Sequence, residues 1–343
     1  MEAIKAVAYG CGRMGRLGIQ FMYKKGVNIV GAIDSNPALA GMDVGEYADL
    51  GVKLGVKIRD DADAVLDECK PDIVIAALFS YVYLCEPMFE KVLSRGINLL
   101  TTCDESHHAW HTSPEVVNRL DRLAKNHHCT ITGSGLQDVF WMNLPLVCAG
   151  GMHEIKRIEG VTTFNTDEYG PALADAYNIG RTLEEFEKKM KGAQPDGFLM
   201  RATNAAIIAT RGLSPNGLTQ QPEPGVSEAD MYSEALGKVV PAGCVIGTKE
   251  IVKSYTQQGI VVESSDIGKL YREGEGDICR WKLYGEPDVE VQVPNVNSYK
   301  FTMSDLVNRI PDVINAAPGY QTNDRFGMTR YLTYPMECYV DRK

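Results

Sequence analysis

The chain has 343 residues, of which 44% are hydrophobic and 23% are charged, and its formal net charge is −10. This composition is typical of a globular protein, and the length suggests two domains. The acidic balance and the lack of basic runs argue against nucleic acid and membranes as partners. Since the sequence has neither a leader peptide nor an apolar run of bilayer length, we expect a cytoplasmic protein.

The first apolar run, residues 4–9, leads directly into Gly10-Cys11-Gly12-Arg13-Met14-Gly15. In such a loop Gly10 turns the chain, Gly12 lets the backbone approach a pyrophosphate and Gly15 allows close helix packing. A second apolar run, residues 28–33, ends in Asp34, where an acid accepts hydrogen bonds from the adenosine ribose. The pattern predicts a dinucleotide site with contacts from Gly10, Gly12, Arg13, Met14, Gly15, Asp34 and Ser35.

Apolar periodicity predicts alternating strands and helices through the first half of the chain. The expected strands are 4–9, 28–33, 73–77, 98–102 and 130–133, and the expected helices are 13–25, 62–69, 83–94 and 114–126. The strands are short and continuously apolar, as in sheets covered on both faces. We therefore predict an α/β fold with a doubly wound parallel sheet of Rossmann type over residues 1–150.

The pattern changes after residue 150. Strands are expected at 155–164, 245–263, 279–283 and 289–293, helices at 183–191 and 201–210, and a loop at 214–225. This indicates an α+β substrate domain over residues 151–297. The C-terminal segment, residues 298–343, contains an amphipathic stretch at 304–310 that we expect to pack back on the first domain.

Ligands of open α/β sheets lie beyond the carboxyl ends of the strands, so the residues that follow each strand are candidate site residues. Asp104 and Glu105 stand after the strand ending at 102, and a carboxylate in a partly dry cleft is a plausible acid/base group. The alternative is that both acids cap a helix. His107 and His108 either line the site or cap the same turn. Phe79, Ser80, Thr102 and Cys103 are expected to border the cofactor.

Neither a disulfide framework nor a metal site is predicted. The nine cysteines are scattered without a CxxC motif. His107 and His111 have the spacing of a helical ligand pair, but no acidic third ligand accompanies them at a recognised spacing.

The motif Gly10-Cys11-Gly12-Arg13-Met14-Gly15-Arg16 is similar to the start of dihydrodipicolinate reductases, but their second-domain motifs do not occur here. A resemblance that covers nearly the whole chain is to the 2,4-diaminopentanoate dehydrogenases and the related native amine dehydrogenases. It is carried by Ile29–Asp34, by Thr101-Thr102-Cys103-Asp104-Glu105, by Val262–Tyr271, and by Leu306-Val307-Asn308-Arg309-Ile310-Pro311-Asp312-Val313-Ile314-Asn315-Ala316.

This resemblance implies NAD(P)-dependent oxidative deamination, with the C4 amine of 2,4-diaminopentanoate converted reversibly to 2-amino-4-oxopentanoate and ammonia. The family's catalytic glutamate corresponds most naturally to Glu105, with Asp104 as the alternative, because the family's Thr-Cys-Glu-Glu reads Thr102-Cys103-Asp104-Glu105 here. The family's Asn-Pro-Gly-Phe is replaced by Gln137-Asp138-Val139-Phe140. The resemblance also implies a homodimer through the second-domain sheet, Asn308 at the cofactor, and substrate contacts from His107, Gln137, Phe140, Asn143 and Thr166.

NAD is the expected cofactor, since the carboxylate of Asp34 repels a 2′-phosphate and neither Ser35 nor Asn36 supplies a cation. Arg13 is within reach of such a phosphate, so we expect NADP to be accepted as well. Two other functions remain open at this point, a reductase of cyclic imines and a non-catalytic NAD(P) sensor.

Overall fold

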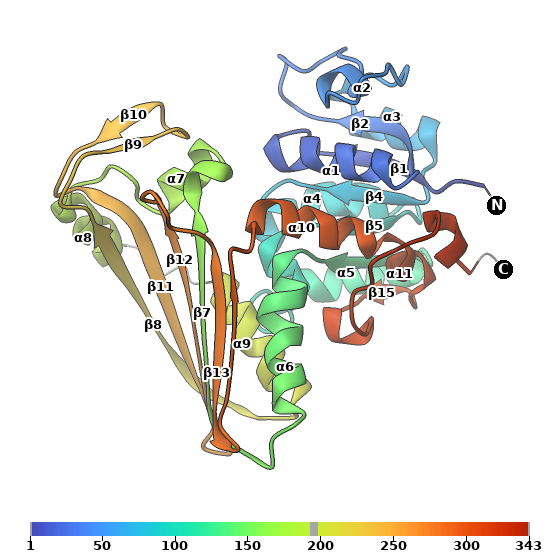
Figure 1. The fold of residues 1–343 in the computed structure, drawn as a ribbon. Coiled ribbons are helices and arrows are strands. Elements are labelled where there is room, and N and C mark those ends of the chain that lie inside the picture. The colour runs from blue at the N-terminus through green and yellow to red at the C-terminus, as the bar shows by residue number, and fades with distance from the viewer. Residues whose placement is uncertain (1, 193–197, 342–343) are drawn as a thin grey trace. The chain divides into compact units, whose positions relative to one another are not determined.

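The computed structural model describes residues 2–192 and 198–341. The chain divides into two compact units (Figure 1). The first combines Met1–Val139 with Lys300–Lys343, and the second is Phe140–Tyr299. No helix among the described residues is long and apolar enough to cross a membrane.

The first unit is built on a seven-stranded parallel sheet in the order β15-β6-β5-β4-β1-β2-β3 (Figure 1). Its strands are β1 (Lys5–Tyr9), β2 (Asn28–Ile33), β3 (Ile58–Arg59), β4 (Ile73–Ala76), β5 (Asn98–Thr101), β6 (Thr130–Gly133) and β15 (Gly319–Tyr320). The helices are α1 (Arg13–Lys24), α2 (Val44–Tyr47), α3 (Ala62–Cys69), α4 (Val82–Leu93), α5 (Pro114–Asn126), α10 (Ser298–Asn308) and α11 (Ile310–Asn315). This topology confirms the predicted doubly wound sheet.

Local sequence explains these elements. All four residues of β4 are apolar and buried, as required of a strand with helices on both faces. Helix α3 begins after Asp61, whose carboxylate accepts a hydrogen bond from the Ala64 N–H, and ends where Lys70 is left-handed. Apolar residues of α3, α4, α5 and the strands form a buried core of this unit.

The second unit is built on a six-stranded mixed sheet in the order β14-β13-β7-β12-β11-β8, in which only the β7–β12 pair is parallel. The strands are β7 (Glu154–Asn165), β8 (Pro215–Val226), β11 (Val245–Thr256), β12 (Val261–Lys269), β13 (Ile278–Glu286) and β14 (Val289–Pro294). A two-stranded sheet joins β9 (Met231–Ser233) to β10 (Lys238–Val240), and the helices are α6 (Leu144–Ala149), α7 (Pro171–Ala176), α8 (Leu183–Gly192) and α9 (Phe198–Thr210).

Two predictions for this unit were wrong. The expected loop at 214–225 is strand β8, and the expected single strand at 245–263 is the antiparallel pair β11 and β12. Strand β8 lies at the edge of the sheet and pairs only with β11, so its other edge tolerates Pro222 and Pro224. The turn between β11 and β12 contains Gly259 at φ +80°, and a glycine at this position is the sequence signal that indicates the turn.

Candidate active site

The glycine loop between β1 and α1 is shaped by close backbone contacts. A Cβ on Gly10 would lie 2.2 Å from the Ala77 carbonyl oxygen, and one on Gly15 would lie 1.8 Å from the Gly10 carbonyl oxygen. A Cβ on Gly12 would meet nothing within 4 Å. Glycine at positions 10 and 15 therefore allows packing within the protein, whereas Gly12 presents open backbone to a ligand.

The N-terminus of α1 is suited to a pyrophosphate. Gly12 is its N-cap, no side chain caps it, and its first turn contains no acid, so its N–H groups and dipole favour an anion. Nearby, the Asp34 carboxylate accepts hydrogen bonds from the N–H groups of Cys11 (2.6 Å) and Asn36 (2.7 Å). These bonds fix Asp34 beside the loop, at the place where the ribose of a dinucleotide binds.

The other predicted cofactor residues lie at the same edge of this sheet. Arg13 and Ser35 are exposed and Met14 is half-buried beside the glycine loop. After β4, Phe79 is 52% exposed, and the Ser80 carbonyl accepts a hydrogen bond from the Cys103 thiol at 3.2 Å. Thr102 is half-buried. Asn308, at the end of α10, is also half-buried, and its buried side-chain oxygen has no partner among the described residues. The loops after β1, β2, β4 and β5 thus present a set of groups that fits a nicotinamide dinucleotide.

Asp104 and Glu105 begin a short 3₁₀ helix (Asp104–His107) after β5, but their carboxylates have different environments. Glu105 is 3% exposed, and its two oxygens accept hydrogen bonds from the Val82 N–H (2.9 Å) and the Ser113 hydroxyl (2.6 Å). These bonds connect the first turn of α4 and the residue before α5. The Glu105 carboxylate therefore holds the ends of two helices together.

Asp104 is half-buried and has the properties of an acid/base group. Desolvation raises the pKa of its carboxyl group to about 6, although a hydrogen bond from the Ser80 hydroxyl opposes the rise. A carboxylate with this pKa is ionised at neutral pH and accepts a proton more readily than an exposed aspartate.

His107 is buried beside Asp104 as a neutral base. Its Nδ1 lies 2.7 Å from the Asp104 carbonyl oxygen, which requires the proton on Nδ1 and leaves a lone pair on Nε2. Nε2 has no partner among the described residues, and desolvation lowers the pKa of the imidazole to about 4. His107 can therefore accept a hydrogen bond from a ligand at neutral pH.

His108 is also kept neutral, since burial lowers its pKa to about 4, and it stacks on His111 with ring centroids 5.7 Å apart. In the described parts of the chain, no three His, Cys, Asp or Glu residues are arranged to hold a metal ion.

The loop after β6 lies against the 3₁₀ helix of Asp104. A Cβ on Gly133 would lie 2.7 Å from the carbonyl carbon of Ser106, so this contact requires glycine. Gln137 is 2% exposed, and its side-chain nitrogen has no hydrogen-bond partner among the described residues. It begins a π-helix, Gln137–Asn143, a rare element found often at functional sites.

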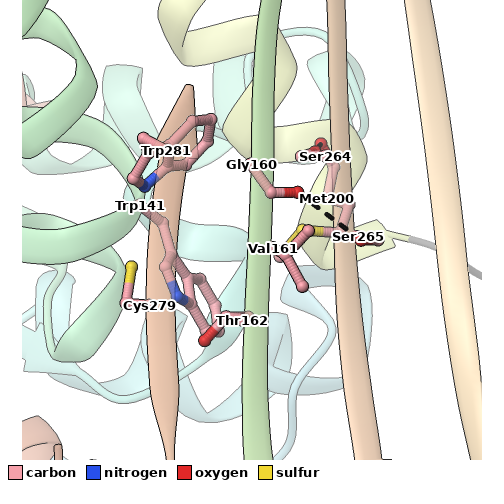
Figure 2. Close-up of a pocket in the computed structure, with 9 residues that line it drawn as sticks. All are labelled: Trp141, Gly160, Val161, Thr162, Met200, Ser264, Ser265, Cys279 and Trp281. Atoms are coloured by element: carbon pink, nitrogen blue, oxygen red, sulfur yellow. Dashed lines mark hydrogen bonds between the residues drawn. The ribbon is translucent and has the colours of Figure 1, made fainter. Parts of the chain in front are cut away.

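In the second unit, the π-helix is held by the Trp281 indole, whose N–H donates to the Phe140 carbonyl at 2.6 Å. Trp281 packs on Gly160, where a Cβ would lie 2.4 Å from its ring. Figure 2 shows both residues in a narrow pocket on this sheet, lined by Trp141, Gly160, Val161, Thr162, Met200, Ser264, Ser265, Cys279 and Trp281. Sequence analysis missed this pocket, because its residues come from α9, the π-helix and three strands that are far apart in the chain.

Three predicted substrate residues also belong to the second unit. Phe140 and Asn143 are half-buried on the π-helix. Thr166 is fully buried directly after β7, and its hydroxyl has no partner among the described residues. A buried hydroxyl without a partner is a candidate contact for a polar ligand.

Comparison with known proteins identifies the family. Residues 140–340 match the family described as the 2,4-diaminopentanoate dehydrogenase C-terminal domain. The curated 2,4-diaminopentanoate dehydrogenase of Acetoanaerobium sticklandii is 26% identical over 351 residues, which cover 94% of this chain and 93% of that protein. The solved amine dehydrogenase from Mycobacterium smegmatis is 39% identical with a TM-score of 0.93, and the match covers 96% of this chain and 98% of that one.

More distant structures share the fold alone. The myo-inositol 2-dehydrogenase of Lactobacillus plantarum is 15% identical with a TM-score of 0.56, over 95% of this chain and 93% of that one. The family match, the amine dehydrogenase match and the dinucleotide-shaped loop agree. The chain belongs to the 2,4-diaminopentanoate dehydrogenase family and is an oxidoreductase that acts on amines with a nicotinamide cofactor.

Proposed function

We propose that this protein catalyses the reversible oxidative deamination of a primary amine, with Asp104 as the acid/base group. The observation that carries this proposal is a half-buried carboxyl group of pKa about 6, beside a neutral His107 with a free lone pair. Both groups follow β5, at the sheet edge where a dinucleotide fold binds its ligands. Glu105 is the weaker candidate, because both of its oxygens already accept hydrogen bonds within the protein.

In the proposed reaction, the Asp104 carboxylate takes a proton from the substrate ammonium and leaves a neutral amine. Hydride acceptance from the amine-bearing carbon is the chemistry that a bound nicotinamide supplies. Asp104 releases this proton to solvent before water adds to the resulting iminium carbon, and the regenerated carboxylate then accepts a proton of that water. The same carboxyl group returns a proton to the departing nitrogen, so that a ketone and ammonia are released.

Substrate contacts are proposed for five residues. His107 accepts a hydrogen bond from the substrate nitrogen through Nε2, and the Gln137 amide donates to a substrate oxygen; both atoms are buried without partners among the described residues. Phe140, Asn143 and Thr166 complete the proposed set. We propose 2,4-diaminopentanoate, oxidised at C4 to 2-amino-4-oxopentanoate, as the first substrate to test, because this is the substrate named for the Acetoanaerobium sticklandii relative.

We propose NAD as the preferred cofactor, with NADP accepted at lower efficiency. The Asp34 carboxylate is held beside the glycine loop by two backbone N–H groups, and it repels a 2′-phosphate.

A substrate panel tests the proposed function. The protein is incubated with NAD and with diamino acids, including 2,4-diaminopentanoate, and simple primary amines, while reduced nicotinamide and ammonia are both measured. The proposal predicts equimolar formation of the two products with at least one amine. Tight NADH binding without turnover of any amine would instead favour a sensor.

A further inference from the structure

A chain of four buried polar side chains supports the loop after β6. The Arg309 guanidinium donates to the Asp138 carboxylate through Nε (2.7 Å) and Nη2 (3.0 Å). The Ser134 Oγ lies 3.0 Å from Asp138 Oδ2 and 3.1 Å from Asp305 Oδ2. All four residues are buried, with exposed fractions of 3% or less.

This group of hydrogen-bonded side chains has too few hydrogens for Arg309, Asp138 and Asp305 all to be ionised. Ser134 has a single hydroxyl hydrogen, yet its oxygen is within hydrogen-bond distance of two carboxyl groups. Asp138 accepts two hydrogen bonds from Arg309 and is therefore the carboxylate. A second hydrogen is required for the contact between Ser134 and Asp305, and only the Asp305 carboxyl group can supply it.

From this geometry we infer that Asp305 remains a neutral carboxylic acid at mildly acidic pH, where an aspartate is ordinarily ionised, and that in this form it donates to Ser134 and positions the loop after β6 for catalysis. Asp305, Ser134 and Asp138 take no direct part in the proposed reaction.

The surrounding charges agree with this inference. Arg309 also pairs with Asp312 at 3.1 Å, and Asp312 pairs with the exposed Arg330 at 3.0 Å. The two guanidinium groups therefore balance the carboxylates of Asp138 and Asp312. An ionised Asp305 would be an uncompensated charge in the protein interior, which is strongly unfavourable. Burial and the charge of Asp138 raise the pKa of Asp305 to about 7, although Arg309 opposes the rise.

Asp305 can influence the site through the backbone that Ser134 anchors. The Ser134 N–H donates to the Thr101 carbonyl at the end of β5, and the preceding Gly133 packs on Ser106 in the 3₁₀ helix of Asp104. Repulsion between ionised Asp305 and Asp138 would loosen this loop. Asp305 is thus a positioning residue, and this part of the inference rests on the proposed function.

The pH dependence has a defined sign. The pKa of an aspartate in the unfolded chain is about 3.9, and the folded value is about 7. Between these values the folded protein binds the proton that the unfolded chain has lost. The contribution of protonated Asp305 to the stability of the folded protein is therefore fully present below about pH 4. It is lost as pH rises from there through about 7.

Asp305→Asn is the informative variant, because its amide donates to Ser134 without titrating. We expect the variant and the wild type to have similar Tm values at about pH 4, and the variant to have the higher Tm at about pH 8. In the control Asp312→Asn, an ionised partner of Arg309 is lost, so Tm should decrease at both pH values. A difference between Asp305→Asn and wild type that does not change with pH contradicts the inference.

Infrared spectroscopy of the wild type provides a second test that needs no active enzyme. The carbonyl band of a protonated carboxylic acid should disappear with a pKa near 7 and should be absent from Asp305→Asn, with Asp104→Asn used to assign the band of the other raised carboxyl group. Absence of a band assigned to Asp305 would show that the group is ionised and overturn the inference.

The positioning role is tested by kinetics. The kcat/KM of Asp305→Asn relative to wild type should rise about fivefold between pH 7 and pH 8, as the wild type loses its proton. A flat ratio combined with a positive infrared result would refute positioning. Failure of every amine substrate would refute the proposed function and leave the infrared result valid.

Discussion

At the scale of single residues, Asp104 and Glu105 are chemically similar neighbours whose carboxylates have different environments and different proposed roles. Both follow β5 on a 3₁₀ helix, where successive side chains point in different directions. One carboxylate accepts bonds from the starts of two helices, and the other is half-buried with a raised pKa. The sequence placed two acids at the correct sheet edge but could not distinguish them, because Val82 and Ser113, the partners of Glu105, lie elsewhere in the chain.

We expect a single residue, Asp34, to decide the preference between NAD and NADP. Asp34→Asn removes the negative charge and retains an oxygen for the Cys11 N–H. We expect the ratio of kcat/KM for NAD to that for NADP to fall by about tenfold, equivalent to about 1.4 kcal/mol. Glu90→Gln, at an exposed position on α4, is the charge control and should leave the ratio unchanged. An unaltered ratio in Asp34→Asn would mean that another group selects the cofactor.

At the scale of elements, sequence periodicity predicted the first unit closely and the second less well. The strands of the first unit are continuous apolar runs covered on both faces, so each carries its own signal. Strand β8 carries little such signal, because it is mostly exposed and contains three prolines and two glycines. Its extended form depends on pairing with β11, which local sequence does not encode.

Helix α9 and its sheet are joined by one buried amide. Asn204 Nδ2 donates to the carbonyls of Val252 and Val262, each at 3.1 Å, and Oδ1 accepts from the Ser264 hydroxyl at 2.6 Å. Asn204→Ala removes these buried hydrogen bonds, so we expect a loss of about 2–4 kcal/mol in the free energy of unfolding.

Denaturant unfolding measures this loss. The control is Asn118→Ala on α5, where the amide is exposed and donates only to the Pro114 carbonyl. The control should lose less than about 1 kcal/mol. Equal losses in the two variants would show that the Asn204 bonds add nothing to stability.

At the scale of the whole molecule, one face of the second sheet is suited to a homodimer, which we propose as the assembly. Along β7 buried residues alternate with half-buried ones, so the two faces differ in exposure. The more exposed face carries the ion pairs of Arg157 with Glu159 and Glu263, and the half-buried Ile251 and Ile267. Half-buried apolar residues bordered by charged ones match the apolar centre and polar rim of a protein interface.

Ile267→Lys places a charge on this face and should convert the proposed dimer to a monomer. The kcat of the variant is measured in parallel. Val239→Lys, at a 54% exposed position on β10, is the control and should remain dimeric. Light scattering coupled to gel filtration gives the mass of each. A monomeric wild type, or a dimer that persists in Ile267→Lys, would contradict this arrangement.

The role of Asp104 as the base for amine oxidation is tested most directly by comparing Asp104→Asn with Glu105→Gln. For each variant, kcat is measured with the best amine of the panel and NADH affinity is measured by fluorescence. We expect Asp104→Asn to bind NADH normally but to lose about 10²–10⁴-fold in kcat, and Glu105→Gln to retain most of its activity. In the wild type, kcat/KM should rise with pH through about 6, as Asp104 ionises. Near-normal turnover by Asp104→Asn, or a comparable loss confined to Glu105→Gln, would contradict it.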